Sequence, residues 1–242
     1  QKEEINRDFF RLRVQKALQR RDLFRSQSKD NAWRLIHGES DLLPGLIVDQ
    51  YQNYLIVQIL SSGVEFHRDL LLDVLRVETG VENIYERSDV DVRKLEGLEP
   101  RSCLVSGSVP DEIIIQEGSF QFLVHLKEGQ KTGFYLDQRE NRRIAASYCV
   151  EKDVLNVFSF TGGFSVYACG NHAKSIVSVD SSVDALELAK RNFALNQMEA
   201  ENVEWIAADA FQQLRKMRDQ ARSFDVVILD PPKFAPTAAQ VE

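Results

Sequence analysis

Residues 154–168, VLNVFSFTGGFSVYA, decide the fold of this chain, because they join an apolar run, a glycine turn and a second apolar run. The first run suits a strand that is covered on both faces, as in a parallel sheet. Thr161-Gly162-Gly163 then removes side chains where a backbone would approach a ligand closely. From Phe164 onward the pattern indicates a helix. Ligands bind at the carboxyl ends of parallel strands, so the turn is a candidate cofactor site.

Strands and helices alternate after this stretch. The apolar patterns predict strands at 176–179, 203–207 and 225–229, and helices at 183–195 and 210–222. Alternation of this kind is typical of a parallel, doubly wound α/β sheet.

The chain before residue 126 has a different pattern. An amphipathic helix is expected to about Arg21, followed by strands at 33–37, 46–49, 54–60, 83–86, 113–116 and 120–125 and a helix at 66–77. A hairpin is expected over 120–136, with its turn at 127–130, and a helix over 138–150. We therefore expect a linker helix over 1–25, a small α+β domain over 26–125 and a cofactor-binding domain over 126–242.

Composition excludes several classes of protein. The 242 residues have 43% hydrophobic and 28% charged side chains, which fits a globular chain, and no apolar run is long enough to span a bilayer. We expect a cytoplasmic protein with no membrane partner. The net charge of -7 argues against indiscriminate coating of nucleic acid. Two basic clusters, one within residues 1–25 and one within 127–143, fit either phosphate binding or a solvated helix face.

Cysteine and histidine spacing gives no metal site. Cys103, Cys149 and Cys169 form no CxxC pair, and the four histidines are scattered. We expect small buried thiols and no metal.

Three acids follow three of the predicted strands. Asp180 lies about 20 residues beyond the glycine turn, where an acid commonly accepts the ribose hydroxyls of a nucleotide-like cofactor. Ser181 and Asp184 could form a capping box for the next helix. Asp209 could reach an adenine amino group. For both Asp180 and Asp209, a helix-start acid is an equally good interpretation.

The fourth strand carries the most specific motif, FDVVILDPPKF at 224–234. Prolines keep the backbone extended, which would direct the Asp230 carboxylate into a cleft where a flipped base could bind it and stack on Phe234. The turn FSFTGGFS is not the G-x-G-x-x-G that a pyrophosphate requires. S-adenosylmethionine, which has no phosphate, therefore fits better than a dinucleotide.

Together, KTGFYLDQREN, VLNVFSFTGGFSVYA, SVDSSVDALELAKRN and FDVVILDPPKF closely resemble the bacterial ribosomal RNA large-subunit methyltransferase I family. PGLIVDQYQNYLIVQ and IYERSDVDVRKLEG extend the resemblance over nearly the whole chain. The resemblance implies a Rossmann-like class I methyltransferase sheet, incomplete here, that uses S-adenosylmethionine to make 5-methylcytosine in large-subunit ribosomal RNA. The implied partner is that RNA, and a homodimer is left open.

The resemblance also implies roles for individual residues. The implied cofactor-binding residues are Gln138, Arg139, Phe158, Ser159, Thr161, Gly162, Phe164, Asp180, Ser181, Asp209, Ala210 and Asp230. Asp230 would also position the target base, together with Pro231, Pro232, Lys233 and Phe234.

Two departures from the family matter. The family's first domain, of the PUA type, is absent, and the sequence reaches only the fourth strand. Such enzymes attack cytosine carbon 6 with a cysteine thiolate. The family supplies that cysteine after the fifth strand, so we expect it beyond this chain. We therefore expect a fragment that is inactive by itself.

Two alternatives stay open. A related branch that methylates guanine shares the same strand and turn layout and needs no thiolate. The piece could also be a cofactor-binding or RNA-binding module without chemistry of its own.

Overall fold

The computed structural model describes residues 4–129, 132–199 and 201–232. Its contacts form two compact units, one of Gln1–Ser119 and Val124–Asp137 and one of Phe120–Leu123 and Gln138–Glu242. Within the described ranges, none of the helices is long and apolar enough to cross a membrane.

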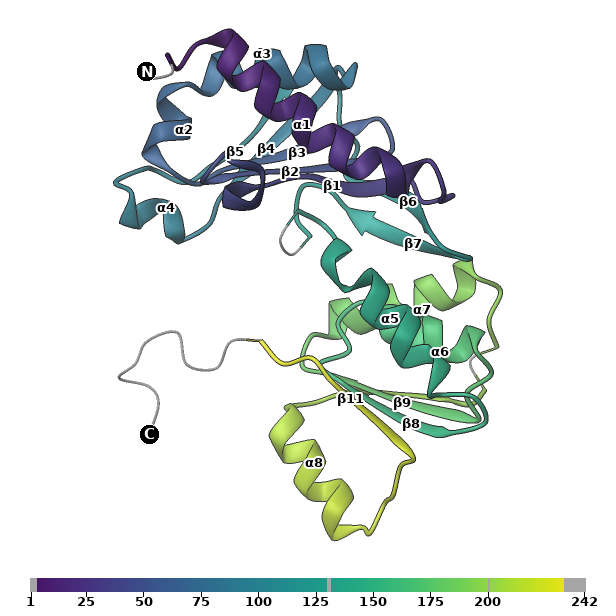
Figure 1. Ribbon diagram of the computed structural model, residues 1–242. Coiled ribbons are helices and arrows are strands. Elements are labelled where there is room, and N and C mark those ends of the chain that lie inside the picture. Colours follow the sequence, from purple (N-terminus) through teal and green to yellow (C-terminus); the bar gives the residue numbers. More distant parts are fainter. Residues whose placement is uncertain (1–3, 130–131, 200, 233–242) are drawn as a thin grey trace. The chain divides into compact units, whose positions relative to one another are not determined.

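The first unit is built on a five-stranded sheet in the order β1-β2-β3-β4-β5 (Figure 1). Its strands are β1 (Ala32–His37), β2 (Leu46–Tyr51), β3 (Tyr54–Ile59), β4 (Asn83–Ser88) and β5 (Arg101–Ser106). Neighbours are antiparallel except β3 and β4, which are parallel and are joined through α2 (Ser62–Phe66) and α3 (Arg68–Thr79). The short helices η1 (Gly38–Asp41) and α4 (Val92–Leu95) complete the connections. The prediction of β1 to β4 and α3 is confirmed; α2, α4 and β5 were not predicted.

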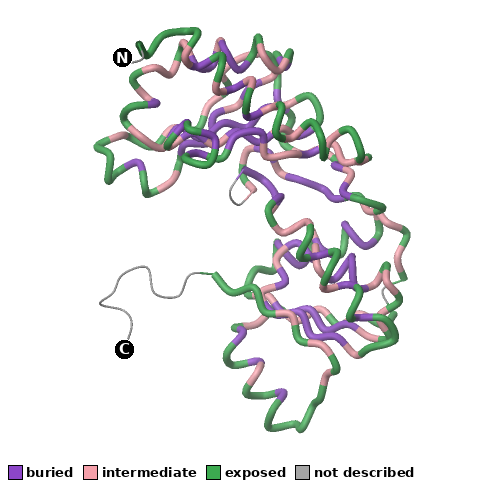
Figure 2. Tube along the Cα trace, viewed as in Figure 1, coloured by how far each residue is buried: buried purple, intermediate pink, exposed green. Residues whose placement is uncertain are grey.

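Helix α1 (Arg7–Arg25) extends beyond the amphipathic pattern, which reaches about Arg21, to the end of the expected 1–25 segment, and it packs along α3 on the sheet (Figure 1). Phe10, Val14 and Ala17 are buried in the unit's core, which Figure 2 shows in purple. Full burial of an apolar side chain contributes about 1.5–3 kcal/mol, so this face holds the helix in place.

The basic residues of α1 are largely engaged with acids of the same unit. Arg7 lies 2.6 Å from Asp73, and Arg20 and Arg21 both contact Asp41, at 3.2 and 2.5 Å. These contacts favour the helix-face interpretation of the N-terminal basic cluster over phosphate binding.

A buried polar cluster in the first unit holds the segment that follows β7 (Phe120–His125). The carboxylate of Asp49, fully buried, accepts two hydrogen bonds of 2.8 Å from Arg34 and one of 2.5 Å from the Thr132 hydroxyl. The Tyr51 hydroxyl lies 3.0 Å from that of Thr132 and accepts a hydrogen bond from the Phe134 amide. Burial raises the pKa of Tyr51, so its hydroxyl stays protonated.

The hairpin expected over 120–136 is wrong. β7 pairs instead with the preceding β6 (Glu112–Glu117) as a two-stranded sheet. Thr132 and Phe134 are not in a strand and are bound through the polar cluster just described. Gln130, part of the expected turn, lies outside the described residues.

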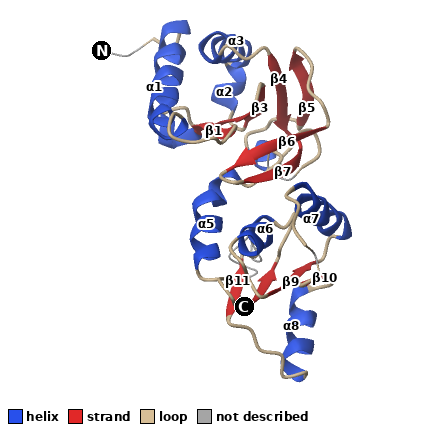
Figure 3. Cartoon of the chain, turned by 90° about the vertical axis from the view of Figure 1, so that its right-hand side faces the viewer, coloured by secondary structure: helices blue, strands red, loops and turns tan. Residues whose placement is uncertain are grey.

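The second unit is a four-stranded, fully parallel sheet in the order β10-β9-β8-β11. Its strands are β8 (Asp153–Val157), β9 (Ser175–Asp180), β10 (Val203–Ala207) and β11 (Val226–Leu229). Helices α5 (Arg139–Ser147), which follows the short η2 (Leu136–Gln138), α6 (Gly163–Gly170) and α7 (Val183–Leu195) lie on one face, and α8 (Ala210–Asp219) lies on the other (Figures 1 and 3). The predicted α/β class with a preceding α+β region is confirmed.

We predict that Tyr51→Phe lowers the free energy of unfolding by about 1 kcal/mol or more, because it leaves buried partners of a hydroxyl unsatisfied. Tyr85→Phe is the matched control, since the Tyr85 hydroxyl makes one exposed contact of 3.3 Å with Ser102. Urea unfolding followed by circular dichroism measures both. Equal losses in the two variants would contradict a structural role for the cluster.

The lowered pKa of Asp41 predicts that the free energy of unfolding depends on pH. Burial alone would raise the pKa of Asp41, but hydrogen bonds from Arg21 and the His37 amide outweigh it and hold the pKa below its ordinary value of 3.8. A lowered folded-state pKa stabilises the fold above the unfolded pKa, and this contribution is lost as the pH falls through the folded value. Asp41→Asn should cost about 1–3 kcal/mol at neutral pH, with the difference from wild type shrinking below about pH 4. A difference that stays constant with pH would refute this, and exposed Asp8→Asn is the control.

Candidate cofactor and base site

The site lies along the carboxyl edge of the parallel sheet in the second unit. Because the four strands are parallel, the turns after Val157, Asp180, Ala207 and Leu229 all lie at one edge. Two groups of predicted site residues come together there. One surrounds the turn after β8, and the other surrounds the end of β11.

The turn after β8 has a strained backbone. Phe158 and Phe160 have φ of 61° and 48°, in the left-handed region that bulky residues rarely adopt. Each such residue costs on the order of 1–3 kcal/mol and persists only where its surroundings hold it. The Ser159 amide donates to the Val179 carbonyl at 3.0 Å, and the Phe160 amide donates to Asp180 Oδ2 at 2.8 Å. The loop is therefore fastened to β9.

Gly162 is required for packing. Its φ is +77°, and a Cβ there would lie 2.8 Å from the Cβ of Ala189 on α7. This differs from the expectation that the absent side chain makes room for a ligand. A Cβ at Gly163, the first residue of α6, would lie 3.1 Å from the Cδ of Arg142, a looser contact than that of Gly162.

Asp180 lies where the sequence predicts, at the end of β9. Its Oδ2 accepts from the Phe160 amide and its Oδ1 from the Ser182 amide, at 2.9 Å. The expected capping box of Ser181 and Asp184 is wrong, because Ser182 is the residue that caps α7, accepting from the Ala185 amide at 3.1 Å. The serine whose side chain can reach a helix amide is set by where the backbone enters the helix, which a one-residue offset conceals.

Asp209 caps α8. Its side chain accepts from the Gln212 amide at 2.9 Å while remaining exposed, and Ala210 beside it is buried. The Ala208 amide donates to the Asp180 carbonyl at 3.0 Å, which brings the ends of β9 and β10 together. A carboxylate oxygen has further lone pairs, so capping leaves acceptor capacity toward the sheet edge.

The second group lines a hollow of about 310 Å³. Gln138, Phe164 and Asp230 are among its lining residues. Gln138 Nε2 donates to Asp230 Oδ2 at 3.1 Å, and Asn141 Nδ2 donates to Gln138 Oε1 at 2.6 Å. Gln138 thus contacts the acid expected to hold the base. Arg139 is half-buried beside it, and Thr161, in the turn, is buried.

Of the DPPKF segment, Pro231 and Pro232 are exposed after β11. Lys233 and Phe234 lie outside the described residues, so the predicted stacking of a base on Phe234 stays a prediction.

The turn contains an orphaned polar atom that fits a ligand. Ser159 is 5% exposed, and its Oγ has no hydrogen-bond partner among the described residues. A buried hydroxyl without a partner is costly, so a ligand that supplies one is favoured there. With Asp180 nearby as acceptor, these groups fit the polar amino-acid and ribose parts of S-adenosylmethionine.

Comparison with known protein families decides the class. A family model described as S-adenosylmethionine-dependent methyltransferase matches residues 97–241, more than half of the chain. The chain belongs to this methyltransferase family. That assignment agrees with the sheet, the turn and the acids at the strand ends.

Curated relatives carry a more specific name. The chain is 47% identical over its whole length to a protein of Tolumonas auensis and 45% identical over 99% of its length to one of Aeromonas salmonicida. Both are named ribosomal RNA large subunit methyltransferase I. The chain spans 61% of the length of each.

Two solved structures that resemble this chain are also described as methyltransferases. A protein of Streptococcus mutans described as a candidate SAM-dependent methyltransferase superposes with a TM-score of 0.85 at 27% identity, covering 96% of this chain and 60% of that one. A candidate methyltransferase solved in complex with SAH gives 0.87 at 28% identity, covering 97% of this chain and 60% of that one.

Several buried polar residues that hold the turn after β8 and helix α6 in place were not predicted from the sequence. Asn156 of β8 donates to Ser165 at 2.8 Å, and Ser165 lies 2.7 Å from Ser178, so a buried polar chain ties α6 to two strands. Asn192 donates to the Thr161 carbonyl at 2.9 Å and accepts from the Leu123 amide at 2.8 Å. Asn192 could have been found, because it shares the buried helical face of α7 with Ala185 and Ala189.

Arg142 was assigned to a basic cluster suited to phosphate or solvent. It is 3% exposed and lies against the glycine turn, so a solvated position for it is wrong.

Two thiols of this chain, Cys149 and Cys169, are poor nucleophiles. Burial raises the pKa of Cys149 and of Cys169. Both therefore remain protonated at neutral pH. The expectation of small buried thiols is confirmed for Cys149 only, because Cys103 and Cys169 are half-buried.

We predict that Gly162→Ala destabilises the fold by about 1–3 kcal/mol, through both the positive φ and the clash with Ala189. In an Ala189→Gly background, which removes the clashing Cβ, Gly162→Ala should cost less than in wild type; the Ala189→Gly single variant is the reference, because glycine inside α7 itself costs about 1 kcal/mol. Gly163→Ala is the control and should change stability little. Thermal and urea unfolding measure the series, and full tolerance of Gly162→Ala would contradict the packing described.

Proposed function

We propose that the complete protein is an S-adenosylmethionine-dependent methyltransferase that methylates carbon 5 of a cytosine in large-subunit ribosomal RNA in the cytoplasm. The observation that carries the proposal is that the strained turn, Asp180 and Asp230 all lie at the same carboxyl edge of the parallel sheet. The names of the relatives support the RNA substrate.

The cofactor would bind along the turn and the two following strand ends. Phe158, Ser159, Thr161, Gly162 and Phe164 would line its methionine part, with the unpartnered Ser159 hydroxyl as the polar contact. Asp180 and Ser181 would hold the ribose. Asp209 and Ala210 would hold the adenine. When bound, the cofactor supplies an electrophilic methyl group on a sulfonium.

The target base would bind beside Asp230, Pro231 and Pro232. An ionised carboxylate accepts hydrogen bonds only, so Asp230 suits the exocyclic amino group of cytosine. Asn141 fixes the amide of Gln138 so that its NH₂ occupies Asp230 Oδ2, which leaves Oδ1 for the base. In this proposal Gln138 serves the base, while Arg139 keeps its proposed position beside the cofactor.

Carbon 5 of cytosine is a poor nucleophile, and a thiolate adding to carbon 6 would activate it. The raised pKa values of Cys149 and Cys169 do not suit that role. We therefore propose that the thiolate comes from a cysteine outside this chain.

The complete protein should transfer a radiolabelled methyl group from S-adenosylmethionine to protein-free large-subunit RNA that lacks the modification. Digestion of the product should place the label on carbon 5 of cytosine. Asp230→Ala should lower the rate by about a hundredfold, because the base loses its alignment, a far larger loss than any change in the calorimetric affinity for S-adenosylhomocysteine, which Asp230 is also expected to contact. Lys190→Ala, on the exposed surface of α7, is the control.

A methyl label found on guanine would contradict the proposed cytosine target and favour the guanine-methylating alternative. No binding of S-adenosylhomocysteine and no transfer by the wild-type protein would overturn the proposal as a whole.

A further inference from the structure

The first unit has a pocket of about 540 Å³ far in sequence from the methyltransferase motifs. It is formed by the end of α1, the start of β1 and the turn between β2 and β3. Its size is within the range of small-molecule sites. The lining residues that matter here are Asp22, Arg25, Asn31, Trp33, Gln50 and Gln52.

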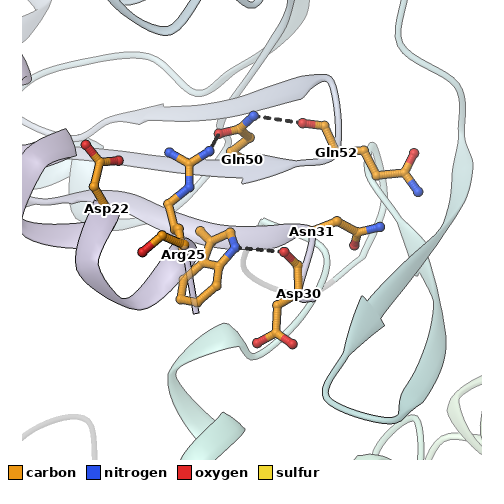
Figure 4. Close-up of a pocket in the computed structure, with 8 residues that line it drawn as sticks. Asp22, Arg25, Asp30, Asn31, Gln50 and Gln52 are labelled. Carbon is orange, nitrogen blue, oxygen red and sulfur yellow. Dashed lines mark hydrogen bonds between the residues drawn. The ribbon is translucent and has the colours of Figure 1, made fainter. Parts of the chain in front are cut away.

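Three side chains of this pocket, Arg25, Gln50 and Trp33, are held by hydrogen bonds. Figure 4 shows Arg25 reaching Gln50, whose amide reaches the carbonyl of Gln52; the distances are 3.2 and 2.8 Å. The Trp33 indole N–H donates to the Asp30 carbonyl at 3.1 Å. This hydrogen bond occupies the only polar atom of the indole, so the Trp33 ring lines the pocket as a flat apolar surface.

Unused hydrogen-bonding capacity remains around that wall. Beyond the bond to Gln50, the Arg25 guanidinium has no further partner among the described residues. The Asp22 carboxylate and the Asn31 amide nitrogen likewise have none in the described part of the chain. The pocket therefore offers donors and an acceptor next to an aromatic ring.

The charges select the kind of ligand. A phosphate would meet the carboxylates of Asp22 and Asp30, and a cationic side chain would meet the guanidinium of Arg25. A neutral planar base avoids both conflicts, because its edge carries donors and acceptors together. Guanine fits best, since its O6 and N7 accept from arginine and its N1 and N2 hydrogens suit a carboxylate.

We propose that this pocket binds an unpaired guanine of the RNA substrate, a contact separate from the methylated base. The inference rests on the proposed RNA substrate but requires neither cofactor nor methyl transfer. Stacking on Trp33 supplies affinity, and Arg25 with Asp22 supplies the preference for guanine.

The chain allows a direct optical test. It has two tryptophans, Trp33 in the first unit and Trp205 in the second, so Trp205→Phe leaves Trp33 as the only reporter. Short uridine-rich RNAs with one central guanine should quench Trp33 fluorescence saturably. The same RNAs with adenine, cytosine or uridine at that position should bind about tenfold more weakly or worse.

Matched variants separate base recognition from general charge. In the Trp205→Phe background, Arg25→Met should weaken guanine binding about tenfold or more, whereas Arg76→Met, at an exposed arginine of α3, should not. Asp22→Asn should reduce the preference for guanine over adenine. Equal binding of all four RNAs, or equal loss in Arg25→Met and Arg76→Met, overturns the proposal.

The assay contains no cofactor and measures no methylation. A failure here therefore leaves the proposed enzyme activity standing, and a failure of methyl transfer leaves this binding measurable. Quenching by free guanosine monophosphate as strong as by the RNA would also overturn it, because the site would then be a nucleotide site and not an RNA contact.

Discussion

The carboxylate of Asp180 is the point on which the second unit depends. One of its oxygens accepts from the Phe160 amide and the other from the Ser182 amide. The strained turn after β8 and the entry to α7 are therefore fixed by the same group. Asp180 is therefore both the acid proposed to hold a ribose and the group that shapes the loop around that ribose. A substitution of Asp180 would change the loop and the proposed binding site together.

Buried polar side chains repeat this arrangement elsewhere. In the second unit, Asn156, Ser165 and Ser178 tie α6 to the sheet, and Asn192 fastens the glycine turn. Each of these side chains makes a hydrogen bond that fixes α6 or the turn against the sheet, where apolar packing alone would let them shift. Buried, satisfied polar groups of this kind select one arrangement among many of similar apolar area.

Sequence patterns predicted the second unit well and the first less well. Helix α7 and strand β10 were predicted with the bounds observed, because their apolar periods are regular and Ser182 and Asn202 lie at clear breaks. β5 was missed because RSCLVS alternates weakly and lies among turn residues. The false hairpin arose because turn signals show where a chain reverses but not which strand it pairs with. The strand-end acids were located from sequence, whereas the Gln138–Asp230 contact joins residues distant in sequence and required the fold.

Strand β7 is shared between the two units, and this limits how recombination can exchange parts of such a protein. Its residues Phe120–Leu123 group with one unit, and Val124 and His125 with the other, so each unit is assembled from two separate segments. A break after Ser119 would part Asp49 from Thr132, and a break after Asp137 would part Phe120 from Tyr167. Genetic exchange at one point therefore cannot transfer either unit intact, and the two are expected to pass between lineages as one piece.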